Sequence, residues 1–175
     1  MMMASEQTDS ISRQKYIDDF MRKFPSSTEG YTNKASSYVN GGKFEEADKV
    51  MQTALEKVAK KDEAHSEYAK VIYQKELFSN KPYTNWSLDK ALDESKKASA
   101  INDLDVYRHQ QAQIIYSKGE YQNAYDMFMA LTKTKLRNGE LFYEASQCKV
   151  QLKAPQKEVM ELLDSAIAAC PQPLT

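Results

Sequence analysis

Apolar residues recur three and four positions apart along most of the chain, which is the spacing expected of amphipathic α-helices. The first such segment carries one apolar stripe, made of Ile17, Phe20, Met21 and Phe24. Pro25 ends the segment, because proline lacks the backbone N–H that a helix interior needs. No segment shows the strict alternation of polar and apolar residues typical of a half-buried β-strand. The pattern therefore predicts an all-α chain whose first helix lies within residues 10–25.

Capping and turn residues mark the breaks between the predicted helices. The sequence SSTE at 26–29 has the form of a capping box, in which a serine and a glutamate side chain bond to backbone N–H groups at a helix start. Gly41 and Gly42 predict a turn before the helix that begins at Phe44. Further on, NWS at 85–87 matches a glycosylation sequon, but the simpler interpretation is that Ser87 caps the next helix while Trp86 packs as a hydrophobic staple.

Two stretches of the chain repeat one pattern. YVNGGKFEEADKVMQTAL begins at Tyr38, IYSKGEYQNAYDMFMALT begins at Ile115, and Gly42 aligns with Gly119. The other agreeing positions are Phe44 with Tyr121, Ala47 with Ala124, and Met51 with Phe128. Small residues extend the repeat, with separations of 34, 43 and 33 residues between Ala35, Ala69, Ala112 and Ala145. An insertion of about ten residues, placed in FSNKPYTNW at 78–86, accounts for the longer interval.

This pattern resembles the tetratricopeptide repeat (TPR), a helix-turn-helix unit of about 34 residues with small and large residues at fixed positions. The resemblance implies an all-α, right-handed α-α superhelix of about four repeats behind an N-terminal capping helix at 10–25. Residues 1–9 are expected to be disordered or the remnant of a targeting segment. The TPR-like region, residues 26–175, divides into repeats at about 26–60, 61–102 with an insertion near 78–87, 103–136 and 137–171.

The insertion leaves two alternatives open. Loops carry function more often than the scaffold that holds them, so residues 78–87 could form a second contact surface. Equally, Tyr83 and Trp86 could fold back onto the helix pair.

Composition and charge narrow the function classes. The 175 residues include 24 Lys and Arg against 25 Asp and Glu, for a net charge of -1, and this balance disfavours a nucleic-acid partner. No apolar run approaches the ~20 residues that cross a bilayer. We therefore expect a soluble protein, either cytoplasmic or, if residues 1–4 end a signal peptide, exported.

No combination of residues predicts catalysis. Five glycines exclude a glycine-rich phosphate loop, and the two histidines, 44 residues apart, give no metal signature. His109 is the best candidate base, but its neighbours in YRHQQAQ supply no positioned carboxylate or hydroxyl. Cys148 occupies a core position of the repeat, and a bridge from it to Cys170 is not expected because the two lie toward opposite ends of antiparallel helices. We expect no enzyme activity, cofactor or metal.

The TPR resemblance implies a concave face lined by the first helix of each repeat. The expected groove residues are Thr32, Ser36, Val39, Ser66, Lys70, Tyr73, His109, Gln113, Tyr116, Phe142, Ser146 and Lys149. The predicted function is a scaffold that binds a peptide or protein in this groove, and the alternative is a structural spacer or oligomerisation segment with no peptide there. The cationic clamp that holds acidic chaperone tails is missing, since Thr32 and Ser36 stand where lysine and asparagine are needed, so we expect a less acidic, partly apolar segment.

The last predicted helix, about residues 156–170, carries an apolar stripe too broad for a helix with one face in water. Its members are Val159, Met160, Leu162, Leu163, Ala166 and Ile167. Because helical repeat arrays normally end in a polar cap, we expect either further repeats or coverage of Met160 and Ile167 by another molecule, including a second copy of the chain.

Overall fold

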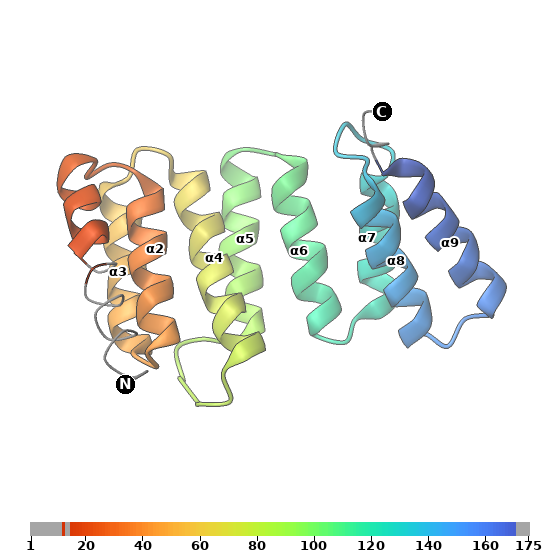
Figure 1. Ribbon diagram of the computed structural model, residues 1–175, viewed down its shortest axis with the longest axis horizontal. Coiled ribbons are helices and arrows are strands. Elements are labelled where there is room, and N and C mark those ends of the chain that lie inside the picture. Colours follow the sequence, from red (N-terminus) through yellow and green to blue (C-terminus); the bar gives the residue numbers. More distant parts are fainter. Residues whose placement is uncertain (1–11, 13–14, 171–175) are drawn as a thin grey trace. The chain divides into compact units, whose positions relative to one another are not determined.

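The computed structural model describes residue 12 and residues 15–170, and every regular element in this part of the chain is an α-helix (Figure 1). Residues 15–23 are helical, and the remainder of the predicted first helix at 10, 11, 13 and 14 lies outside the described residues, as do 1–9 and 171–175. The later helices are α2 (Thr28–Asn40), α3 (Phe44–Lys57), α4 (Lys61–Phe78), α5 (Leu88–Ile101), α6 (Asp105–Ser117), α7 (Tyr121–Leu131), α8 (Gly139–Gln151) and α9 (Gln156–Ala169). The all-α prediction is confirmed. No described helix combines the length and the apolar character needed to cross a membrane.

The helices belong to two compact units, Met1–Ile101 (unit 1) and Asn102–Thr175 (unit 2). In unit 1, α2 pairs with α3 and α4 pairs with α5, and α4 also packs on α2 and α3. In unit 2, α6 pairs with α7 and α8 pairs with α9, and α8 also packs on α7. Each pair is a helix-turn-helix, and α2, α4, α6 and α8 are the first helices of their pairs.

The turns that follow α2, α6 and α8 share one hydrogen-bonding pattern. After α2, the N–H of Gly42 donates to the carbonyl of Val39 at 2.9 Å. The N–H of the next residue, Lys43, donates to the carbonyl of Tyr38. The same two bonds recur around Gly119 and around Lys153, which is the Schellman arrangement. The central residue is left-handed each time, with φ of 71° at Gly42, 82° at Gly119 and 54° at Lys153. Glycine adopts this conformation freely, whereas the Cβ of Lys153 strains it.

Small residues separate the paired helices where the repeated pattern places them. Ala47 on α3 and Ala124 on α7 are both fully buried. Met51 and Phe128, one turn further along, are also buried and fill the space beside these alanines. The repeated alanines and large apolar residues are therefore packing positions, as predicted, because close helix approach needs a small side chain opposite a large one.

The loop at 79–87 joins α4 to α5 and folds back onto the helices of unit 1, to which it belongs. Trp86 is buried, and its Nε1 donates to Oδ1 of Asp48 on α3 at 3.0 Å. The hydroxyl of Tyr83 donates to Oδ2 of the same carboxylate at 3.0 Å, and the hydroxyl of Tyr68 on α4 donates to Oδ1. Burial raises the pKa of both tyrosines, and the Asp48 charge raises it further. Tyr83 and Trp86 therefore pack against the helix pair, as one of the two alternatives for the insertion proposes.

Unit 2 depends on a close approach between the start of α8 and the end of α9. A Cβ at Gly139 would lie 2.6 Å from the carbonyl oxygen of Ala166 and 2.8 Å from the sulfur of Cys170. Since that carbonyl belongs to the helix backbone, only glycine fits there. Cys148 is fully buried in the same core, and Cys148 and Cys170 are free thiols, as expected.

One predicted helix start is confirmed and one is wrong. Ser87 caps α5, because its hydroxyl accepts from the backbone N–H three residues later at 3.1 Å. The capping box at 26–29 does not form: Ser27 is the N-cap residue of α2, and its side chain makes no capping hydrogen bond. Instead, the hydroxyl of Tyr31 donates to the carbonyl of Pro25 at 3.0 Å and fixes how the chain enters α2.

Candidate functional site

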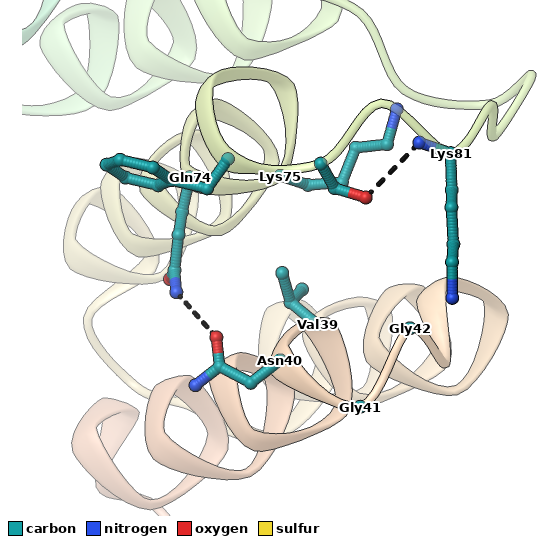
Figure 2. Close-up of a pocket in the computed structure, with 9 residues that line it drawn as sticks. Val39, Asn40, Gly41, Gly42, Gln74, Lys75 and Lys81 are labelled. Carbon is teal, nitrogen blue, oxygen red and sulfur yellow. Dashed lines mark hydrogen bonds between the residues drawn. The ribbon is translucent and has the colours of Figure 1, made fainter.

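Polar side chains meet where the first helices of unit 1, α2 and α4, face each other. The hydroxyl of Ser36 donates to Oε1 of Gln74 at 3.3 Å. Nε2 of Gln74 donates to Oδ1 of Asn40 at 3.2 Å (Figure 2). Ser36 and Asn40 are four residues apart on α2, so both lie on the face of this helix that points toward Gln74. The result is a row of hydroxyl and amide groups that is open to solvent at the Asn40 end.

A pocket of about 360 Å³, the α2–α4 pocket, adjoins this row. Its lining residues are Val39, Asn40, Gly41, Gly42, Gln74, Lys75, Phe78, Ser79 and Lys81. Figure 2 shows the amides of Asn40 and Gln74 at one side of the pocket and the side chain of Lys81 at the other. Phe78, the last residue of α4, is 82% exposed. The pocket therefore combines amide donors and acceptors with a cation and an exposed aromatic ring.

The first helices of unit 2, α6 and α8, meet through ionisable groups instead. Nε2 of His109 on α6 lies 2.5 Å from Oε2 of Glu144 on α8, and Nε2 of Gln113 donates to Oε1 of Glu144 at 2.7 Å. The His109 ring also packs edge-on against Phe128, with centroids 5.9 Å apart. Burial alone would lower the pKa of His109, but the hydrogen bond to Glu144 and the charges of Glu144 and Glu140 outweigh it and raise the pKa.

The second histidine, in unit 1, has a different environment. Nδ1 of His65 lies 2.7 Å from Oε2 of Glu94, whose other oxygen accepts from Lys90 at 2.7 Å and from Lys97 at 3.0 Å. Burial would raise the pKa of Glu94, but the hydrogen bonds from Lys90, His65 and Lys97 outweigh this and lower it. Glu94 is only 2% exposed; its contact with His65 joins α5 to α4, and its bonds to Lys90 and Lys97 lie within α5.

The groove residues predicted in unit 1 are mostly accessible. Thr32, Ser36, Ser66 and Tyr73 are half-buried and Lys70 is exposed. Val39, another predicted groove residue, is buried, although it lines the α2–α4 pocket. The structure brings Ser36 into the polar row.

In unit 2, only part of the predicted set is accessible. His109 and Gln113 come together at Glu144, as described above. Phe142 and Ser146 do not face solvent: they are 7% and 0% exposed and belong to the interior. The reason is that α8 packs against both α7 and α9, so most of its circumference is covered.

The remaining two predicted groove residues of unit 2 are engaged with neighbouring helices. Tyr116 is half-buried and packs edge-on against Tyr121, with ring centroids 5.3 Å apart. Nζ of Lys149 bonds to Glu158 of α9 at 2.9 Å and lies 4.5 Å from the centroid of the Tyr125 ring. Both side chains therefore contribute to packing within unit 2.

Asn40, Gln74 and Glu144 are not among the predicted groove residues. Asn40 and Gln74 lie four residues after the predicted Ser36 and Lys70, so extending each face by one helical turn would have found them. Glu144 gives no such signal, because its importance depends on the residues that α6 places opposite it.

An apolar groove of about 580 Å³, the α8–α9 groove, runs between α8 and α9 in unit 2. Its lining residues are Gly139, Glu140, Tyr143, Met160, Leu163, Asp164, Ala166, Ile167 and Cys170. Tyr143, Met160 and Ile167 are 53%, 48% and 70% exposed. The broad apolar stripe predicted for α9 is therefore open on this face.

The helix pairs, their Schellman turns and their buried alanine spacers define a TPR-type fold. No protein-family model matches the chain, and no curated protein matches it. Solved structures do match. YrrB, described as a TPR protein with an unusual peptide-binding site, has a TM-score of 0.61 and 19% identity over 98% of this chain and 83% of its own.

Two further solved structures agree. MamA has a TM-score of 0.64 and 12% identity over 94% of this chain and 91% of its own. The pilF protein of Pseudomonas aeruginosa has a TM-score of 0.66 and 10% identity over 95% of this chain and 72% of its own. At these identities the likeness shows the fold alone, and it confirms the TPR-like fold predicted from the sequence.

Proposed function

We propose that this protein is a protein-binding scaffold and that the α2–α4 pocket takes a partly apolar peptide segment. The observation that carries the proposal is the convergence of the Asn40 and Gln74 amides beside the exposed ring of Phe78. YrrB, which shares the fold, is described as having a peptide-binding site, and this likeness supports a role of the same class.

The chemistry of the pocket suits an extended peptide. Such a peptide presents both N–H donors and C=O acceptors, and asparagine and glutamine amides can satisfy either. An exposed aromatic ring gains free energy when a partner covers it, and such rings are common anchors at interfaces. Two lysines line the pocket, and the ammonium of Lys75 is already paired with Glu76 at 2.8 Å, so Lys81 supplies the charge at the edge of the pocket. This favours a segment with one acidic group over a strongly acidic one.

We propose a binding role and not a catalytic one. In the described part of the chain, His109 bonds to a carboxylate and an amide, so it has no hydroxyl or thiol to activate as a nucleophile. His65 is held by a carboxylate that two lysines also occupy.

Selection of peptides from a random displayed library against the full chain, followed by affinity measurement, tests the proposal. Asn40→Arg places a long cation in the pocket, and we expect it to weaken the selected peptide by about tenfold or more. Gln52→Arg is the matched control, because Gln52 is exposed on α3 and lies outside the pocket. Equal affinity of Asn40→Arg and Gln52→Arg for the peptide would show that the pocket is not the binding site.

The α8–α9 groove favours a second candidate role, in which another protein molecule covers Met160 and Ile167. Light scattering over a concentration series tests self-association of this kind. Ile167→Glu should remove any concentration dependence, and Lys157→Glu, at a position whose side chain is 86% exposed on the same helix, should not. A monomer at every concentration would exclude a second copy as the covering molecule.

A further inference from the structure

We propose that His109, Glu140 and Glu144 of unit 2 form a binding site for a divalent transition-metal ion such as Zn²⁺. His109 belongs to α6, whereas Glu140 and Glu144 lie one helical turn apart on α8. One ligand atom from each residue can be chosen so that all lie within 4.8 Å of one another. This proposal does not depend on peptide binding by the α2–α4 pocket, which lies in the other unit.

The spacing is close to what a metal needs. Zinc binds imidazole nitrogen and carboxylate oxygen at about 2.0–2.2 Å, so the ligand atoms of a tetrahedral site lie about 3.3–3.6 Å from one another. Nε2 of His109 and Oε2 of Glu144 share a hydrogen bond at 2.5 Å, so a bound ion takes the place of the shared proton and the two atoms move apart by about 1 Å. Glu140, which is exposed, supplies the third ligand atom, within 4.8 Å of the other two.

The donor types favour a transition metal over calcium or magnesium. An imidazole nitrogen suits zinc, copper, nickel and iron, whereas calcium and magnesium prefer oxygen ligands alone. Two carboxylates balance the charge of a divalent ion. Three protein ligands also leave a coordination position for water or for a group from a partner.

The surroundings position these ligands. Gln113 donates to Oε1 of Glu144 at 2.7 Å, which orients the carboxylate and leaves Oε2 directed at His109. Such hydrogen bonds to a ligating carboxylate strengthen metal sites. Phe128 forms an apolar wall beside the imidazole. The side chains of His109 and Glu144 are 15% and 18% exposed, so the site is sheltered but can be reached from solvent past Glu140.

The other histidine shows why this pair differs. Glu94, the partner of His65, accepts from Lys90 and Lys97, and these ammonium groups would repel a cation. Among the described residues, no lysine or arginine forms an ion pair with Glu140 or Glu144. The chain therefore holds a matched internal control, with one histidine–glutamate pair open to a metal ion and one already neutralised by lysines.

Zinc titration of the full chain by isothermal calorimetry, after removal of metal with a chelator, tests the proposal. All variants carry Cys170→Ser, because the exposed thiol of Cys170 could bind zinc by itself. We expect one Zn²⁺ per chain, with His109→Asn and Glu140→Gln each weakening binding by about tenfold or more. His65→Asn should leave the affinity unchanged.

Two readouts keep the test decisive. Co²⁺ in place of Zn²⁺ gives a visible absorption band that reports coordination by nitrogen and oxygen, and this band should be lost in His109→Asn. Glu140 is exposed and only begins α8, so Glu140→Gln should keep the helical circular dichroism of the parent even if His109→Asn does not. Absence of zinc binding by the parent chain, or unchanged affinity in Glu140→Gln, would overturn the proposal.

Discussion

Units 1 and 2 place one helix-turn-helix framework beneath two different surfaces. When Gly42 is aligned with Gly119, Ala47 falls on Ala124. The two glycines form the left-handed turns and the two alanines are buried spacers, so each pair has the same role in the two units. The same alignment puts Thr32 and Ser36 at the positions of His109 and Gln113. Packing fixes the turn and spacer positions, whereas the faces of the first helices are free to carry neutral amides and hydroxyls in unit 1 and ionisable groups in unit 2.

A second difference lies inside the framework. The alignment places Asp48 of α3 on Tyr125 of α7. Asp48 is 4% exposed and accepts hydrogen bonds from three aromatic side chains, two of them from the loop before α5. Tyr125 is half-buried, and Lys149 lies over its ring. Unit 1 thus uses one buried carboxylate to hold an insertion that unit 2 lacks.

Asp48→Ala should have the largest effect on stability, about 3 kcal/mol, because it leaves the buried donors of Trp86 and Tyr68 without an acceptor. Urea denaturation measures the loss. Trp86 is the only tryptophan of the chain, so its fluorescence also reports whether the loop opens. Tyr125→Phe at the equivalent position should change stability by less than about 0.5 kcal/mol. Wild-type stability in Asp48→Ala would show that the carboxylate does not hold the loop.

Ala47→Leu and Ala124→Leu test whether the framework is shared. Each alanine is fully buried between paired helices, so a leucine should overpack the pair and cost about 1–3 kcal/mol. The two losses should agree with each other to within about 1 kcal/mol, as measured by thermal or urea denaturation. Tolerance of leucine at only one of the two positions would contradict the equivalence of the units.

Glu94→Gln tests the closed histidine–glutamate pair through the pH dependence of stability. The folded-state pKa of Glu94 is lowered, so its contribution is present above the ordinary glutamate pKa of about 4.3 and is lost as pH falls through the lower folded value. At neutral pH the substitution should cost on the order of 1–2 kcal/mol. The gap between the urea-unfolding curves of the two proteins should close as the solution is acidified. A gap that does not depend on pH would mean that the ionised form is not what stabilises the fold.

The turns should show the smallest effects. Gly119→Ala forces a Cβ into a left-handed conformation and should cost about 1 kcal/mol. Lys153→Gly relieves the same strain after α8, but glycine loses more backbone entropy on folding, so we expect a gain of only about 0.5 kcal/mol or less. Thermal melting of the two variants should shift in opposite directions. A shift of both in the same direction would show that the turns are not equivalent.

The sequence predicts the framework well because packing repeats in register. The alanine spacing and the glycine turns recur at fixed intervals, so Ala47, Ala124, Gly42 and Gly119 can be identified without a structure. The surface is harder to predict, since it depends on which helix faces which. Phe142 resembles a groove residue by its position in the repeat and is buried, because α8 is packed on two sides.

The candidate sites depend on contacts between residues far apart in the chain. Glu144 lies 35 residues from His109, and Asp48 lies 38 residues from Trp86, so no local pattern links them. Asp48 occupies a position in the repeat that carries a tyrosine in unit 2, and only the folded-back loop explains an acidic residue there. Such pairings follow from the fold and cannot be found from helix periodicity alone.

Amide chemical-shift mapping by NMR tests whether the α2–α4 pocket of unit 1 is the binding surface for a peptide. A peptide selected against the full chain is added to isotopically labelled protein, and the shifted resonances are assigned to helices. We expect the largest changes on α2, α4 and the start of the loop, around Asn40, Gln74 and Phe78. Changes confined to α3 and α5, or to the α8–α9 groove, would contradict it.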